Sequence, residues 1–468
     1  MIRYRRDLNL KIKRIGYKPG DATYEEDIPS KNILLIGNGF DLRAGIESTF
    51  KDFIFYVIYG CALHNLNTDR LFSDIQMSNY VKIDCSYPSQ LKILLHSKDL
   101  NVYKKCSEFA DNILGRMIFD HLFNSKSFCN LILYFGSFID SRPFSKEQLD
   151  SIKSIYGLSS FCRFNDLKIP KNELNKGIGT LIDIVERERD NLKDNFNVES
   201  WLDIESVIEM LVTGSEELKL KYGFEQEGAV KWNASTSNEF LNGLELFELL
   251  LTLYLRETQK IDIKAENANA FFDSLRDAHI HSLTKRSHGR IQDFNLSNPN
   301  VIINYNYTNI AERFYRALER NPEIIHINGS IDVPDEIRLS ELDTNIVIGY
   351  TNTNRCQVSK DAFPFEKQAR RVIKNTEYVN INNLIDSGMF DLIIVGHSCG
   401  IADSDVIGRL LSSENLKTAV ILCHSYLDLV LAFNNIKAML TEDRFNELLS
   451  FSEKEIYGNL YFSVENKA

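Results

Sequence analysis

Residues 31–53, with the sequence KNILLIGNGFDLRAGIESTFKDF, decide the fold of this chain. The stretch opens with an apolar run at residues 33–36, which is typical of a short strand buried on both faces of a sheet. A glycine turn at residues 37–39 follows at once, and a helix is expected from Phe40 onward. A strand, a glycine turn and a helix N-terminus form the phosphate-binding device of dinucleotide-binding folds, because glycine lets the backbone approach a pyrophosphate. The alternative is an ordinary tight turn between a strand and a helix.

The composition of the 468 residues limits the classes of protein that fit. A hydrophobic content of 44% is enough to build the cores of two or three structural units. The net charge of −11 argues against nucleic acid as a partner, since neutralising phosphates takes an excess of lysine and arginine. The 8 cysteines are scattered without a C-x-x-C pair, which indicates free thiols of a reducing compartment and no metal site.

Neither end of the chain, nor its middle, carries a membrane signal. The N-terminal residues 1–21 are basic but lack the apolar core of a signal peptide. The longest apolar run, residues 249–255, is too short to cross a bilayer. We therefore expect a cytoplasmic protein with no membrane partner.

The middle of the chain has the pattern of helices. From about residue 50 to residue 295, apolar residues recur at helical spacing and alternating strand patterns are few. The clearest case is residues 200–211, where Ser200 and Asp203 resemble a capping box and Trp201 lies on the apolar face. This region is predicted to be mainly helical.

Strand patterns return after residue 298. Short apolar runs, each followed by a polar or glycine-containing turn, occur at residues 300–308, 323–330, 346–349, 392–396 and 419–423. Short strands separated by helices predict a parallel sheet, and ligands of such sheets bind beyond the carboxyl ends of the strands. Four polar turns are therefore expected to meet at one edge, at residues 37–41, 304–308, 326–330 and 396–405.

These patterns predict an α/β fold, in which a Rossmann-like parallel sheet is interrupted by a large, mainly helical insert. Residues 1–30 are expected to form a polar N-terminal tail, and residues 61–295 the helical insert. Residues 31–60 and 296–440 together form the predicted nucleotide-binding domain, and residues 441–468 add a C-terminal helix and strand.

Four motifs in this order resemble the AbiH family of bacterial abortive-infection proteins. They are IGNGFDL at residues 36–42, WLDIE at 201–205, NYNYTN at 304–309 and GHSCGIAD at 396–403. The resemblance implies a role in antiphage defence. It also implies a phage-derived trigger and a homo-oligomer as the working form.

The order of the turns is also similar to that of sirtuin-like NAD-consuming domains. Those domains carry a G-A-G-x-S turn, a T-x-N-Y-D turn, an H-G turn and a final strand that ends in glycine. Here the turns at residues 37–41, 306–309, 328–330 and 396–398 stand at these places. The resemblance implies NAD as a substrate or ligand, with no prosthetic group. Asn306 would then orient the nicotinamide ribose, or a water for attack at its anomeric carbon, while residues 37–41 would hold the phosphates.

Three residues depart from the sirtuin-like pattern. Asp41 replaces a small hydroxyl residue, so it either repels a pyrophosphate or serves as a helix N-cap. Thr308 replaces an acidic residue, and Asn328 stands where a histidine acts as general base. His326, two residues earlier on the same predicted strand, should point to the same side as Asn328 and could substitute, as could His397.

We therefore expect an antiphage effector that binds NAD or a related nucleotide and, if active, hydrolyses its N-glycosidic bond. The catalytic candidates are Asn306, His326 and Asn328. The binding candidates are Gly37, Asn38, Gly39, Phe40, Asp41, Asn304, Tyr305, Thr308, Gly396, His397 and Ser398.

Other interpretations of these motifs stay open. The loss of the histidine favours a nucleotide-sensing module without catalysis, and the asparagine turn at residues 304–308 could be held by Asx hydrogen bonds alone. Arg276 and His281 fit the short R-polar-x-x-x-H pattern of HEPN ribonucleases. Ser398 lies in a G-x-S-x-G sequence, which is typical of α/β-hydrolases, with His424 downstream.

Overall fold

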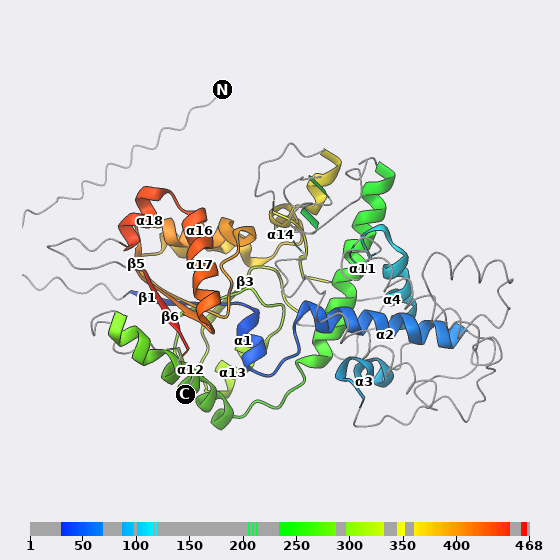
Figure 1. Cartoon of the computed structure of the whole chain (residues 1–468), viewed down its shortest axis with the longest axis horizontal. Helices are drawn as coiled ribbons and strands as arrows, with labels where there is room; N and C mark the ends of the chain where they lie inside the picture. Colours follow the sequence, from blue (N-terminus) through cyan, green and yellow to red (C-terminus); the bar gives the residue numbers. More distant parts are fainter. Residues whose placement is uncertain are drawn as a thin grey trace, which may run out of the picture.

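A six-stranded parallel sheet with the strand order β3-β2-β1-β4-β5-β6 forms the centre of the computed structural model (Figure 1). The structure describes residues 30–68, 87–97, 101–115, 118, 205, 208–209, 212–213, 234–286, 296–331, 344–351, 360–449 and 460–465. The strands are β1 (Lys31–Ile36), β2 (Val301–Asn304), β3 (Glu323–His326), β4 (Phe390–Val395), β5 (Leu416–Cys423) and β6 (Leu460–Val464).

The strand order reverses at β1, which pairs with β2 on one side and β4 on the other. In the register of the sheet, Ile36 lies beside both Asn304 and Val395, and Asn304 lies beside His326. The first four strands therefore end level with one another, and the turns that follow them start side by side. In open α/β sheets, the reversal point at the carboxyl edge is where ligands bind.

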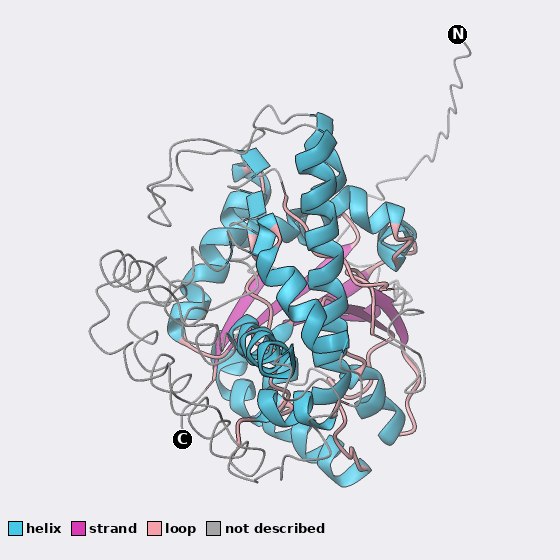
Figure 2. Ribbon diagram, turned by 90° about the vertical axis from the view of Figure 1, so that its right-hand side faces the viewer, coloured by secondary structure: helices cyan, strands magenta, loops and turns pink. Residues whose placement is uncertain are grey.

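Helices cover both faces of the sheet, and Figure 2 shows the strands enclosed between them. Alternate residues of β1 point to opposite faces: Ile33 and Leu35 join one core, Leu34 and Ile36 the other. This double burial explains the unbroken apolar run of β1. The first face carries α15 (Ile381–Asp386), α16 (Ser404–Ser412), α17 (Tyr426–Met439) and α18 (Glu442–Leu449), and the second carries α1 (Asn38–Arg43), α12 (Ala265–Arg286) and α13 (Ile310–Ala317).

A second, helical core lies beside the sheet, on the right of Figure 1. It is built by α2 (Phe50–Thr68), α3 (Ser89–His96), α4 (Asn101–Asp111) and α11 (Ala234–Thr258). Stacked and tilted aromatic rings, such as Phe50, Phe53 and Phe247, fill its centre. The short helix α14 (Lys367–Ile373) lies between α11 and the sheet, and the 3₁₀ turns η5 (Lys360–Phe365), η6 (Glu377–Asn380) and η7 (Ile401–Asp403) complete the described elements.

The predicted α/β class, the Rossmann-like parallel sheet and the mainly helical insert are confirmed. The predicted strand at residues 346–349 is wrong. Ile346 and Ile348 pack into the helical core, and the N–H of Val347 donates to the carbonyl of Asn328 at 2.9 Å, so no sheet strand forms there. The apolar run has a packing role in the wall between the two cores.

Two elements from the predicted insert and the C-terminal segment pack on or pair with the sheet, which the sequence did not predict. Helix α12, in the segment assigned to the insert, packs Ala268, Phe272 and Leu275 against the sheet. Strand β6, in the C-terminal segment, pairs with β5. The N-terminal residues 1–29 and Trp201 lie outside the described residues. Among the described helices, none combines the length and apolar character needed to cross a membrane.

Candidate functional site

A cavity of about 260 Å³ lies beyond the carboxyl ends of β1, β2 and β4. The sheet side contributes the turns after these strands, and the helical side contributes Ser48, Thr49, Glu205 and Leu255. Ten of the predicted site residues line the cavity, namely Gly37, Asn38, Asp41, Tyr305, Asn306, Thr308, Asn328, Gly396, His397 and Ser398. This volume is slightly smaller than the roughly 300–1,000 Å³ of most pockets for drug-sized ligands.

The predicted glycine turn serves mainly to bring two turns into contact. The N–H of Gly39 donates to the carbonyl of Gly396 at 2.8 Å, and the N–H of Gly37 donates to that of Val395 at 3.0 Å. A Cβ on Gly39 would lie 2.7 Å from the Cα of Gly396, and Gly396 itself has a φ of +61°. The protein therefore already uses both glycine N–H groups that were expected to hold phosphates.

Asp41 joins the first turn to the second. Its Oδ1 accepts from Asn306 Nδ2 at 2.9 Å and its Oδ2 from Thr308 Oγ1 at 2.5 Å. The side chain is buried, and it lies inside α1, whose N-cap is Gly37, so Asp41 is not the helix cap. Burial raises the pKa of Asp41 to about 7, because the two hydrogen bonds, which lower it, only partly offset the lost solvation.

Asn306 is held in one orientation by two acceptors. Its Nδ2 donates to Asp41 Oδ1 and to the carbonyl of Gly37 at 3.0 Å, so both amide hydrogens are used. Its Oδ1 is therefore the atom of the amide left for the cavity. Asn304 instead shapes the loop, because its Oδ1 accepts from the N–H of Asn306 at 2.9 Å and closes an Asx turn. The Asx interpretation thus holds for Asn304, which does not line the cavity.

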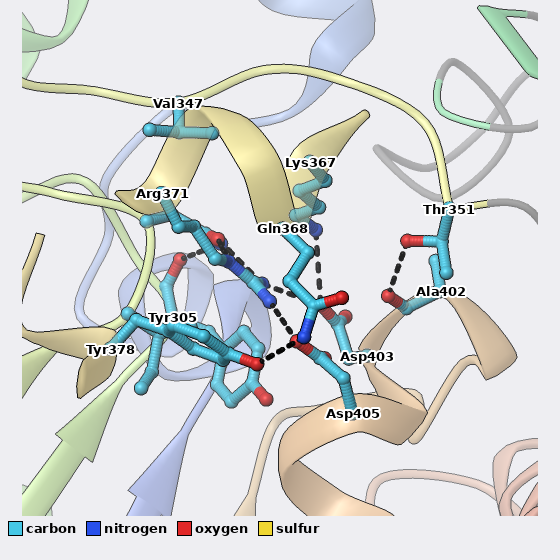
Figure 3. A network of polar contacts seen from close by, with 12 residues as sticks. Tyr305, Val347, Thr351, Lys367, Gln368, Arg371, Tyr378, Ala402, Asp403 and Asp405 are labelled. Atoms are coloured by element: carbon cyan, nitrogen blue, oxygen red, sulfur yellow. Dashed lines mark hydrogen bonds and ion pairs between the residues drawn. The ribbon is translucent and has the colours of Figure 1, made fainter. Parts of the chain in front are cut away.

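A buried network of charged side chains forms the wall of the cavity that faces Asp41 and Asn306 (Figure 3). Lys367 Nζ lies 2.6 Å from Glu205 Oε1 and 3.0 Å from Asp403 Oδ1. Arg371 contacts Asp403 at 3.2 Å and Asp405 at 2.8 Å. Burial alone would raise the pKa of Asp403, but Lys367, the contact with His397 and Arg371 hold it well below its usual range. Burial raises the pKa of Glu205 despite Lys367.

The four motifs quoted from the sequence therefore meet at this cavity. Three of them are the turns after β1, β2 and β4, and the fourth supplies Glu205 to the opposite wall. The sequence model of the AbiH family, described as "Bacteriophage abortive infection AbiH", matches residues 33–424. The chain belongs to the AbiH family. No curated protein and no solved structure matches it.

Membership of the AbiH family implies that this protein acts in phage abortive infection. Lys367, Arg371, Asp403 and Glu205 of this AbiH chain were not among the predicted site residues. The signals present in the sequence were the basic residues of α14 and the acidic residue of the WLDIE motif. Neither signal shows from sequence alone that the two groups neutralise each other.

Asn328 and His326, two of the catalytic candidates, take different places. Asn328 reaches the cavity, yet its Oδ1 accepts from Arg371 at 2.8 and 3.1 Å and its Nδ2 donates to the carbonyl of Tyr305 at 3.2 Å. His326 does not line the cavity, and its Nε2 bonds to Glu312. Burial lowers the pKa of His326, but Glu312 outweighs it, so the net shift is upward. Strand β3 ends at His326, which is why the two side chains do not share a side.

His397, the other histidine expected near the site, has a fixed tautomer. Its Nδ1 accepts from the backbone N–H of Cys399 at 2.9 Å, so the ring proton must sit on Nε2, which lies 3.4 Å from Asp403 Oδ2. The ring packs edge-on against Tyr305. Phe40 is the remaining binding candidate, and it packs in the core against Phe271 and Phe314 away from the cavity.

The alternative motifs are not assembled into sites by the described residues. Ser398 and His424 both line a neighbouring cavity of about 540 Å³, but His424 pairs with Glu465 at 2.9 Å, and the described structure holds no Ser398–histidine hydrogen bond. Arg276 is exposed on α12 and pairs with Asp273 and Asp277, while the side chain of His281 lies outside the described residues. No metal-ligand cluster occurs within the described part of the chain.

Proposed function

We propose that this AbiH-family protein binds NAD or a related nucleotide in the 260 Å³ cavity and hydrolyses its N-glycosidic bond, which arrests the infected cell. The observation that carries the proposal is the fixed amide of Asn306. Its Nδ2 is held by Asp41 and Gly37, and its oxygen is left to accept from a ribose hydroxyl or an attacking water.

The chemistry of the cavity wall supports a ribose as the group that lies over the turns. Asp41, Glu205, Asp403 and the Asn306 oxygen offer hydrogen-bond acceptors, and Lys367 is the cation among the described lining residues. Acceptors suit sugar hydroxyls and also suit the positive charge that develops at the anomeric carbon when a glycosidic bond breaks. With the glycine N–H groups occupied, the phosphates are expected to lie outside this cavity.

Two departures from the sirtuin-like pattern support the proposal because they compensate each other. In that pattern the first turn carries a hydroxyl residue and the second an acidic one. Here the acid is Asp41 in the first turn and the hydroxyl is Thr308 in the second, and the two side chains are hydrogen-bonded at 2.5 Å. Each turn thus has one member of an acid–hydroxyl pair, as in the sirtuin-like pattern, but the acid and the hydroxyl have changed places between the turns.

The test is to incubate the purified full-length protein with NAD, with and without lysate of phage-infected cells, and to follow nicotinamide release by chromatography. We expect release that Asn306→Ala abolishes or lowers by at least about 10²-fold, because the cavity loses its oriented amide. Asn269→Ala, on the exposed face of α12, is the matched control and should release nicotinamide as the wild type does. Release that Asn306→Ala leaves unchanged would sink the proposal.

A nucleotide sensor without catalysis is the second candidate, and one observation favours it. Asn328 stands where the sirtuin-like pattern has its basic histidine; its Oδ1 accepts two hydrogen bonds from Arg371 and its Nδ2 donates one to the carbonyl of Tyr305. An amide held in this way accepts no proton from water. Measurable NAD binding by calorimetry, together with no nicotinamide release under either condition, would select the sensor.

A further inference from the structure

Three carboxylates line the cavity, and they differ in their charged neighbours. Glu205 lies 2.6 Å from Lys367, and Asp403 is surrounded by Lys367, Arg371 and His397. Each of these two carboxylates therefore balances a buried cation. Asp41 contacts only neutral donors among the described residues, the amide of Asn306 and the hydroxyl of Thr308. A carboxylate without a cationic partner can take up a proton without breaking an ion pair.

We propose that Asp41 takes the proton from the water that attacks the anomeric carbon. This role rests on the proposed N-glycosidic hydrolysis. The water gives one proton to the Asp41 carboxylate and its oxygen bonds to the anomeric carbon. The bond from that carbon to the nicotinamide nitrogen breaks, and its electron pair stays on the nitrogen. The cationic ring thus leaves as neutral nicotinamide, and Asp41 later returns its proton to solvent.

Both oxygens of Asp41 can accept a further hydrogen bond from a water. Each carboxylate oxygen has two acceptor positions, and the hydrogen bonds from Asn306 and Thr308 fill one on each. The bond to Asn306 Nδ2 also directs the Asn306 oxygen into the same cavity. A water that donates one proton to Asp41 and the other to Asn306 would be oriented by both side chains.

The surroundings of Asp41 suit a proton acceptor near neutral pH. Glu312 on α13 has a negative charge that raises the pKa of Asp41, and it is itself bonded to His326. The other charged side chains described at this cavity are Glu205, Lys367 and Asp403. His397 lines the same cavity, and its Nδ1 accepts from the N–H of Cys399. Burial and the negative charge of Glu312 raise the pKa of Asp41, the hydrogen bonds from Thr308 and Asn306 lower it, and the balance lies at about 7, where a general base is most effective.

The experiment combines rate and titration. In the wild type, nicotinamide release should rise with pH through a midpoint near 7. Asp41→Asn keeps the shape, since its amide can donate to Thr308 and its oxygen accept from Asn306, but it should lower kcat about 10²–10⁴-fold. Thr308→Val removes a bond that lowers the pKa and should move the midpoint to higher pH, whereas Thr308→Ser keeps the hydroxyl and the midpoint.

A second readout does not depend on turnover. Aspartate side-chain ¹³C NMR of the full chain, assigned by the signal lost in Asp41→Asn, should show Asp41 titrating near pH 7. A titration in the ordinary aspartate range would overturn the role, as would Asp41→Asn releasing nicotinamide at the wild-type rate. If the wild type releases none with infected-cell lysate, the proposed function fails and this role fails with it. Release with an unmoved Thr308→Val midpoint overturns Asp41 alone.

Discussion

The buried carboxylate of Asp41 should make the stability of the protein depend on pH, and Asp41→Asn should remove that dependence. The pKa of Asp41 is about 7 in the folded chain and 3.8 for a free side chain, so folding favours the protonated form. The stabilising contribution is full below pH 3.8 and is lost as the pH rises to about 7. A difference of about 3 pKa units corresponds to about 4 kcal/mol.

The assay is urea unfolding of the wild type and Asp41→Asn at pH 5, 6, 7 and 8. The asparagine variant should gain stability relative to the wild type as the pH rises through this window, by about 2–3 kcal/mol between pH 5 and pH 8, because only the wild type must ionise a buried group. Asp443→Asn, at an exposed position on α18, is the control and should show no such trend. A stability difference between wild type and Asp41→Asn that stays constant from pH 5 to pH 8 would refute the reasoning.

Two further predictions test the contact between the turns at Gly39 and Gly396 and the ion pairs of Lys367. Gly39→Ala should destabilise the chain by about 1–3 kcal/mol and weaken NAD binding, because its Cβ would meet Gly396 Cα at 2.7 Å. Gly408→Ala is the control, because a Cβ there would lie 3.9 Å from its nearest neighbour. In thermal unfolding this variant should be as stable as the wild type or up to about 1 kcal/mol more stable. Lys367→Met should cost about 3–5 kcal/mol, because it leaves two buried carboxylates without their lysine. An equal loss in the exposed Lys437→Met would argue against that explanation.

Much of the fold follows from local sequence patterns. The apolar runs of β1, β4 and β5 are long enough to identify buried strands, whereas the reversal of the strand order at β1 comes from the pairing of the sheet. The run at residues 346–349 has the same local pattern, yet Ile346 and Ile348 pack into the helical core and the N–H of Val347 donates to the carbonyl of Asn328. An apolar run shows that a segment is buried, while pairing depends on whether a neighbouring strand is within reach.

The turns that surround the site could be predicted from local patterns. Parallel strands that end at Ile36, Asn304 and Val395 must bring the turns that follow them together, because such strands share a carboxyl edge. The sequence also supplied Asn306 as a lining residue.

The role of each side chain at the site is set by the folded structure. In the fold, the glycine N–H groups donate to protein carbonyls. Asp41 is hydrogen-bonded to Thr308, and Lys367 pairs with two acids. His326 is hydrogen-bonded to Glu312 and lies away from the cavity. The physical reason is that hydrogen-bond partners and desolvation depend on residues far apart in the chain, such as Asp41 and Thr308, which are separated by 267 positions. Local patterns carry no record of such contacts.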